Sequence, residues 1–336
     1  VEAVREVTVM KDITLYTTFL GGGFGRRLKS DFIKEAAEIS MNIKRPVKLL
    51  WTREEDLAYD FYRPGAVVDM RARMHKGAIG MECRVAVQAV HEEGTEKEVD
   101  PAAVAGIWNT LYSIKNMRVE YGRVALPLRA GPWRSVGNSN NAFFMESFMD
   151  EAAVALKRDP LEFRLSVLED ERAKNVLRKV SEMSHWGRSM AAGCAQGLAF
   201  HHSFGSYCAE VAEVSIEDHI KVDRMFVAID CGKTINNGII RQQVEGAIIM
   251  GLSVALRERM SFVDSFATTQ NFDSYRLLRM EDAPRTEILI VDSDASAGGV
   301  GEPALPPVAP AVANAVFRAG GGRLRELPLK IERKAQ

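Results

Sequence analysis

The alternation of hydrophobic and polar positions predicts strands along much of the chain. Residues 6–20 are rich in β-branched and apolar types, which favours a strand ending at the glycine run that begins at Gly21. A turn at Lys76-Gly77 is expected to join two of the other predicted strands. By the same criteria these lie at residues 46–51, 66–74, 79–90, 118–126, 209–217, 221–230 and 287–291.

Apolar residues that recur at helical spacing predict helices between these strands. Ser30 is expected to cap the first helix, and Asp159-Pro160 combines a capping residue with proline at the first helical position. The predicted helices span residues 31–44, 138–158, 160–169, 239–257 and 310–319. Because strands and helices mix without a strict βαβ alternation, the pattern predicts an α+β fold.

Length and composition limit the class of protein. The 336 residues suggest about two domains at roughly 150 residues each. Residues 172–192 are polar and weakly patterned, so a boundary is expected near residue 185. With 44 basic and 45 acidic residues, the chain lacks the basic excess expected of a nucleic-acid-binding protein. No apolar stretch approaches the ~20 residues of a membrane span, since the longest, Gly246 to Leu256, is too short.

The cysteines and histidines do not form a recognisable metal site. Cys83, Cys194, Cys208 and Cys231 form no CxxC pair, so they indicate neither a zinc site nor an iron–sulfur cluster, and buried apolar roles are expected. His201-His202 is the only histidine cluster, and neighbours on a strand point to opposite faces. No metal ligand is therefore assigned to a side chain of this chain.

Three glycine-containing turns could carry chemistry. Residues 21–27 (GGGFGRR) could bring bare backbone close to a ligand, but Arg26 stands where the last glycine of a GxGxxG fingerprint would be. Residues 131–140 place an arginine, hydroxyls and amides before a helix, which suits an anion, and residues 298–303 present Glu302 between glycines and a proline. Taken singly, the first segment is equally compatible with a tight turn, whereas the second is more typical of a capped helix and the third of a solvated carboxylate.

Together these segments resemble the molybdopterin-binding large subunit of the xanthine dehydrogenase/aldehyde oxidase family, in particular the isoquinoline 1-oxidoreductase β-subunit type. The resemblance follows the later part of such a subunit in order. Its segments are GGGFGRR (21–27), RPVKLLWTREED (45–56), YRPGA (62–66), GPWRSVGNSNNAF (131–143), FMDEAA (148–153), AEVAEVSI (209–216), AIDCG (228–232), QVEGA (243–247), NFDSYRLLRM (271–280), GGVGEP (298–303) and RLRELPL (323–329).

The resemblance implies a molybdenum-cofactor-binding fold of two α+β subdomains of related size with mixed sheets. Residues 1–185 would hold the GGGFG and WRSVG segments, and residues 186–336 would hold QVEGA and GGVGEP. Glu302 would be the catalytic carboxylate. The implied cofactor-binding residues are Gly22, Gly23, Phe24, Gly25, Arg134, Ser135, Gly137, Gln243, Gly299, Val300 and Gly301.

The implied reaction is hydroxylation of an N-heteroaromatic compound or aldehyde with water as the oxygen source. Glu302 would take a proton from a hydroxyl group on the molybdenum of a molybdopterin, expected in the cytosine dinucleotide form. Electrons would leave to [2Fe–2S] clusters on a separate small subunit, because this chain lacks the cysteines to bind them. The missing N-terminal part of the large subunit is a second expected partner.

Several departures from the family pattern keep alternatives open. Family subunits are about twice this length, Asn237-Gly238 stands where Asn-Pro is usual, and Ala247 replaces a glycine. One alternative is a non-catalytic scaffold or assembly partner without cofactor. Another is a nicotinamide dehydrogenase that uses the Gly21 loop, which the failed fingerprint disfavours. The sequence leaves the compartment open between cytoplasm and periplasm.

Overall fold

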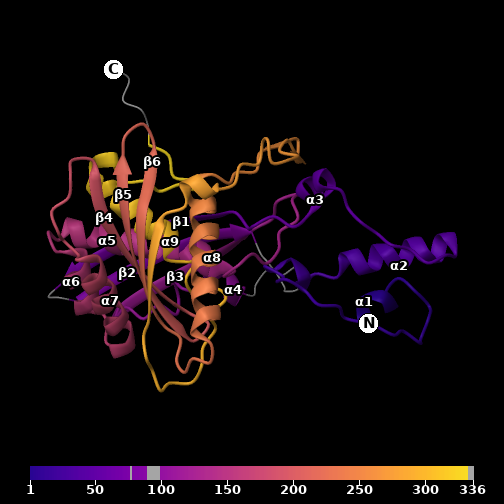
Figure 1. Cartoon of the computed structure of the whole chain (residues 1–336), viewed down its shortest axis with the longest axis horizontal. Helices are drawn as coiled ribbons and strands as arrows, with labels where there is room; N and C mark the ends of the chain where they lie inside the picture. Colours follow the sequence, from indigo (N-terminus) through magenta and orange to yellow (C-terminus); the bar gives the residue numbers. More distant parts are fainter. Residues whose placement is uncertain (76–77, 89–98, 332–336) are drawn as a thin grey trace.

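The computed structural model describes residues 1–75, 78–88 and 99–331, and these form two mixed sheets with helices packed on them (Figure 1). The smaller sheet has the order β1-β2-β3, with β1 and β2 antiparallel and β2 and β3 parallel. The larger sheet has the order β4-β5-β6-β9, in which only β6 and β9 run parallel. The mixed sheets and the many helices confirm the predicted α+β class.

Seven strands make up these two sheets, and β7 and β8 form a separate hairpin. Their bounds are β1 Ala66–His75, β2 Ala78–Gln88, β3 Asn116–Val124, β4 Cys194–Ser203, β5 Ser206–Ile216, β6 Ile220–Asp230, β7 Phe262–Val263, β8 Phe266–Ala267 and β9 Arg285–Ile290. The predicted turn at Lys76-Gly77 lies outside the described residues.

Most of the helices lie around the two larger sheets, and the first three lie away from them (Figure 1). Their bounds are α1 Glu2–Arg5, α2 Asp31–Ile43, α3 Arg53–Tyr59, α4 Pro101–Val104, α5 Gly137–Ala155, α6 Pro160–Val167, α7 Glu171–Ser184, α8 Asn237–Leu256 and α9 Val308–Val316, with short helical turns at Arg26–Leu28, Met280–Asp282 and Phe317–Gly321. The predicted cap of α6 is confirmed, because the Asp159 side chain accepts hydrogen bonds from two N–H groups of its first turn. Ser30 precedes α2 but makes no such bond.

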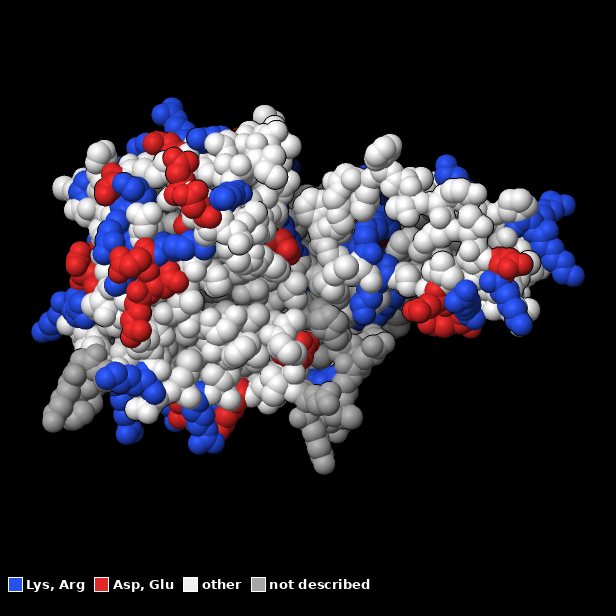
Figure 2. All heavy atoms as spheres, turned by 90° about the horizontal axis from the view of Figure 1, so that it is seen from below, with Lys and Arg blue, Asp and Glu red and all other residues white. Residues whose placement is uncertain are grey.

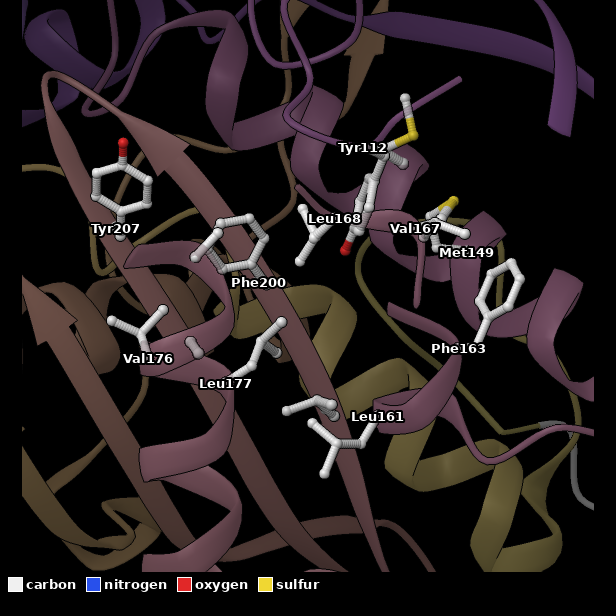
Figure 3. Packing of buried hydrophobic residues seen from close by; sticks show 14 of the residues in the cluster. Tyr112, Met149, Leu161, Phe163, Val167, Leu168, Val176, Leu177, Phe200 and Tyr207 are labelled. Atoms are coloured by element: carbon white, nitrogen blue, oxygen red, sulfur yellow. The ribbon is translucent and has the colours of Figure 1, made fainter. Parts of the chain in front are cut away.

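The larger sheet is buried on both faces. Phe200 and Tyr207 lie on one face with Val176 and Leu177 of α7 (Figure 3). Cys208 and its same-face neighbours pack against α8 and α9 on the other. Helix α9 approaches β4 so closely that a Cβ on Gly197 would stand 2.1 Å from the backbone nitrogen of Ala315. Helix α5, which follows one candidate site segment, lies within this core and not on the surface.

The first 60 residues form an arm that extends away from the body (Figure 1). The strands predicted at 6–20 and 46–51 do not form there, so these predictions are wrong for the described chain. The reason is that a strand needs a pairing partner, and none of the described residues pairs with either segment. Helix α2 forms as predicted, because its hydrogen bonds are local.

No helix was predicted in the weakly patterned segment 172–192, but the structure has one there. Helix α7 occupies most of it, with Ala173, Val176, Leu177 and Val180 buried at helical spacing. The many charged residues on the opposite face of α7 conceal this pattern in the sequence. Strand β4, which the sequence analysis did not identify, follows directly.

Helix α8 confirms the helix predicted at residues 239–257, and as a whole it is more apolar than its longest uninterrupted apolar stretch suggested. It has 20 residues with a mean hydropathy of 1.3, so length and composition alone would let it cross a membrane. Half of that window is buried inside the structure, and core helices pass the same test. It is the only such helix in the part of the chain that the structure describes.

Candidate functional site

A strained turn precedes α5 and contains the predicted WRSVG segment. Ser135 and Val136 have φ values of 73° and 50°, and for a β-branched residue this is a true outlier. Such conformations cost about 1–3 kcal/mol each and persist only where the surroundings impose them. The next residue, Gly137, packs so tightly that an added Cβ would lie 1.8 Å from the carbonyl oxygen of Ala102.

This turn is hydrogen-bonded to the predicted catalytic carboxylate, Glu302, which lies 167 residues further along the chain. The backbone N–H of Ser135 donates to Oε1 of Glu302 at 2.9 Å, and the Ser135 hydroxyl donates to the Glu302 carbonyl oxygen, also at 2.9 Å. Oε2 of Glu302 accepts no hydrogen bond from the described residues. The strained conformation therefore fixes one carboxylate oxygen and leaves the other available.

Arg134 joins three of the predicted segments. Its Nε donates to the carbonyl oxygen of Gly301 at 2.7 Å, and its Nη2 donates to the same oxygen and to the carbonyl oxygen of Gln243 at 3.1 Å. Its guanidinium carbon lies 5.9 Å from the ring centre of Phe24. Only 7% of Arg134 is exposed, and this burial lowers its pKa, while the charge of Glu302 acts in the opposite direction.

The loop that carries Glu302 is held by a hairpin that the sequence analysis missed. The two-residue turn Phe204-Gly205 joins β4 to β5 with both φ values positive, as a type I′ turn requires. The N–H of Gly299 donates to the carbonyl oxygen of Phe204 at 2.7 Å, and the Ser206 hydroxyl donates to the Gly299 carbonyl oxygen at 2.6 Å. The glycine of this pair, between two runs of strand-forming residues, is the sequence feature that could have predicted the turn.

A second missed contact supports the start of α5. His201 Nε2 lies 2.9 Å from Oδ1 of Asn138, and desolvation lowers the pKa of the imidazole to about 3. The ring is thus neutral at physiological pH and, as the donor to this carbonyl oxygen, carries its proton on Nε2. His202 faces the other way and lies against Tyr207, as the alternation on a strand predicted.

The glycine loop of residues 21–25 touches this cluster at its end. A Cβ on Gly25 would stand 2.0 Å from the carbonyl oxygen of Pro132, so the two loops are in direct contact. An added Cβ on Gly22 would meet only the ring of Phe24, and one on Gly23 only the side chain of Arg27. No N–H from residue 21 to residue 25 donates to an acceptor in the described chain. No strand precedes the loop, so it also lacks the strand–turn–helix context of a nicotinamide-binding loop.

The predicted site residues therefore divide into two groups. A tightly bonded cluster joins the turn before α5, the start of α8 and the loop before α9. Its members are Arg134, Ser135, Gln243, Gly299, Gly301 and Glu302, with Gly137 directly behind them and Val300 packed against the core. The loop containing Gly22, Gly23, Phe24 and Gly25 borders this cluster and is more exposed.

A hollow that could hold a ligand lies elsewhere. It has a volume of about 1260 Å³ and is lined by residues of α3, β1, α5 and the end of α8. Of the WRSVG segment it touches only Trp133, and Glu302 is not in its wall. Among the residues described, no group of three or more His, Cys, Asp or Glu side chains could hold a metal ion.

Two sequence models of the molybdopterin cofactor-binding domain family match the chain, at residues 5–168 and 149–284. The isoquinoline 1-oxidoreductase subunit beta of Brevundimonas diminuta is 32% identical over 95% of this chain and 43% of that protein. The membrane-bound aldehyde dehydrogenase [pyrroloquinoline-quinone] of Gluconacetobacter polyoxogenes is 31% identical, over 95% of this chain and 46% of that protein. The chain thus spans less than half the length of these curated relatives.

Solved structures agree on the fold. Quinoline 2-oxidoreductase from Pseudomonas putida 86 superposes with a TM-score of 0.79 over 89% of this chain and 65% of that chain, at 14% identity. The CO dehydrogenase of Oligotropha carboxidovorans gives a TM-score of 0.80 over 91% of this chain and 65% of that chain, at 13% identity. At these identities the similarity concerns the fold alone.

Proposed function

Because the chain belongs to the molybdopterin cofactor-binding domain family, we propose that it is the catalytic portion of a molybdenum hydroxylase large subunit. The observation that carries the proposal is the hydrogen bond between Ser135 and Glu302. It brings the carboxylate of one glycine-rich loop against a second predicted cofactor segment, although the two are 167 residues apart. A scaffold without cofactor has no physical need for this arrangement.

The residues present fit a molybdopterin. The unpaired N–H groups of residues 21–25 and the exposed side-chain amide of Gln243 are donors suited to phosphate and pterin oxygens. An added Cβ on Gly301 would meet nothing closer than 3.8 Å, so the backbone there is accessible, whereas Gly299 is bonded to Phe204 and Ser206 and would support the loop. We propose that these groups hold the cofactor, which when bound supplies the redox chemistry.

In this proposal the chain itself orients the reactants and moves a proton. Glu302 is the general base, and its Oε2 would accept the proton of the water-derived oxygen nucleophile. The Ser135 N–H keeps the carboxylate in one orientation, so little reorganisation precedes proton transfer. Arg134 acts as a positioning residue, because it fixes the carbonyl oxygen immediately before Glu302.

The finer assignments rest on the same similarity. We propose an N-heteroaromatic or aldehyde substrate, a cytosine dinucleotide form of the cofactor, and transfer of electrons to a small [2Fe–2S] subunit. Two of the relatives are an isoquinoline oxidoreductase and an aldehyde dehydrogenase, which supports this substrate class. The missing part of the large subunit is proposed as a second partner. The division at residue 185 likewise stays a proposal.

The test is Glu302→Gln in the assembled enzyme, purified from a molybdate-fed host with its partner subunits. We expect unchanged molybdenum content and turnover lower by about 10²–10⁴-fold, the usual contribution of a general base. Exposed Glu281, replaced by glutamine, is the matched control and should leave turnover unchanged.

Two outcomes would contradict the proposal in different ways. Turnover of Glu302→Gln within tenfold of the parent would mean that another residue is the base. Absence of molybdenum from the parent protein, even with the small subunit co-expressed, would instead favour the scaffold function.

A further inference from the structure

The hollow lined by α3, β1, α5 and the end of α8 has the size and the wall of a ligand site. Its volume of about 1260 Å³ is at least that of the pockets that hold drug-sized ligands. Its wall is rich in aromatic rings, which come from segments far apart in the chain. These are Phe61, Tyr62, Trp133, Phe143, Phe144, Phe148, Phe262 and Tyr275. Such rings pack well against a flat apolar ligand.

One cation in this wall has no anionic partner. Arg63 Nη2 donates to the Ser139 hydroxyl at 3.1 Å, but the buried Nε of Arg63 has no acceptor among the described residues. No carboxylate of the described chain forms an ion pair with Arg63, and burial lowers the pKa of its guanidinium to about 10. A buried donor and a desolvated charge are costly when unpaired, so the surroundings of Arg63 favour an anion.

The other charged side chains of the wall do not supply this anion. Three of its carboxylates already have partners: Asp60 is paired with Arg26, Glu151 with Arg325, and Glu258 with the hydroxyl of Tyr275. The remaining charged residues are exposed to solvent, which screens their charges, and they are Asp56, Arg259 and Glu326. Arg63 is therefore the desolvated charge in this wall that a ligand could pair with.

The Arg63 guanidinium is also held in one position. Its central carbon lies 4.8 Å from the ring centre of Trp133, and the Ser139 hydroxyl that it contacts donates in turn to the carbonyl oxygen of Val136 at 2.9 Å. A planar fork of donors that is fixed in this way matches the two oxygens of a carboxylate.

We propose that this hollow binds a planar aromatic compound that carries one carboxylate. The carboxylate pairs with Arg63, and the ring lies among the aromatic side chains of the wall. Glu302 does not line the hollow, so the site goes beyond the proposed hydroxylation and does not depend on a bound cofactor.

Isothermal titration calorimetry of the purified protein with 2-naphthoate and with the uncharged 2-naphthalenemethanol tests the proposal. We expect 2-naphthoate to bind at one site with a dissociation constant of about 1 mM or lower, which is a modest affinity for a ligand of its size. The alcohol should bind at least about tenfold more weakly, because it cannot form a charged bidentate pair with the guanidinium. Absence of saturable binding of the acid, or equal affinity for the two compounds, would overturn the proposal.

Arg63→Met tests the location of the acid. It removes the cation and should weaken binding of 2-naphthoate at least about tenfold, while binding of the alcohol stays within about twofold. Arg285→Met is the matched control, since Arg285 is exposed on β9 and lies outside the wall, and it should leave both affinities within about twofold. Equal binding of 2-naphthoate by the two variants would refute the site.

Glu258→Gln tests the same location without removing a buried cation, so it decides the question even if Arg63→Met does not fold. Glu258 lines the hollow, and its charge raises the pKa of Arg63 against the effect of burial. Glutamine keeps an acceptor for the Tyr275 hydroxyl, which lies 2.5 Å from Oε2 of Glu258. Loss of this negative charge should tighten binding of 2-naphthoate at least about twofold and leave binding of the alcohol unchanged. Unchanged or weaker binding of the acid would contradict the assignment to this hollow. Because turnover is not measured, failure here leaves the proposed function standing.

Discussion

The buried ion pair between Glu146 and Arg164 provides the sharpest test of how the body holds the candidate site. Glu146 lies on α5, the helix that begins at the strained turn, and both side chains are at most 1% exposed. Arg164 Nε donates to Oε2 of Glu146 at 2.9 Å, and its Nη2 donates to the Glu146 carbonyl oxygen at 2.9 Å. Tyr112 and the N–H of Phe200 also donate to the carboxylate, at 2.5 Å and 3.0 Å.

Arg164→Met keeps most of the volume but leaves the Glu146 carboxylate buried without its cation. Removing one partner of a buried pair costs roughly 3–5 kcal/mol of unfolding free energy. Glu146→Gln removes the negative charge instead and leaves the Arg164 guanidinium buried without a carboxylate partner. In the double variant neither charge remains, so its loss should be smaller than the sum of the two single losses by about 0.5–3 kcal/mol.

Urea unfolding at pH 7, followed by circular dichroism for the parent, both single variants and the double variant, measures these differences. Tyr112→Phe tests one neutral donor alone and should cost about 1–3 kcal/mol. The reasoning would be refuted if Arg164→Met lost less than about 1 kcal/mol, or if the single losses simply added.

Three further predictions concern other parts of the structure. Burial raises the pKa of Glu210, so the folded state keeps a proton that the unfolded state loses above about pH 4.5. The free energy of unfolding should therefore fall as pH rises from there, and in urea unfolding Glu210→Gln should gain more stability over the parent at pH 8 than at pH 4.5. An equal gain at the two pH values would contradict this prediction. Gly25→Ala sets a Cβ against the Pro132 carbonyl and should lower molybdenum content without changing the unfolding midpoint of the body. Arg134→Lys replaces a fork of donors with one ammonium and should lower turnover at least about tenfold. Turnover within tenfold of the parent would contradict this prediction.

The elements that the sequence predicted correctly are those with local causes. Helix α2 and the cap of α6 depend on residues within one turn of each other, so the pattern alone identifies them. The strand predicted at 6–20 failed because pairing depends on a partner that no local pattern specifies. Helix α7 was missed although its apolar stripe was present, because its charged face dominates the average polarity of the segment.

The site itself could be predicted only through the resemblance. Nothing in the spacing of the chain relates Ser135 to Glu302, and their contact depends on α5 and the β4–β5 hairpin meeting in three dimensions. The positive φ of Val136 could not be foreseen either, because a β-branched residue normally avoids that region. The glycine at residue 205 could have predicted the Phe204-Gly205 turn from the local sequence. Nothing in the local sequence could have predicted that this turn supports Gly299.

The two groups of site residues differ in what holds them, and this difference has a consequence for assembly. The cluster around Glu302 is attached to α5, which is anchored in the core by the buried Glu146–Arg164 pair. Lys and Arg side chains gather where the arm joins the body (Figure 2), and the glycine loop contacts the body through Gly25, which lies against Pro132. A preformed base and a loosely held cofactor loop imply that the carboxylate is in place before the loop is. Cofactor retention should therefore be more sensitive to changes in the glycine loop than the folding of the body is.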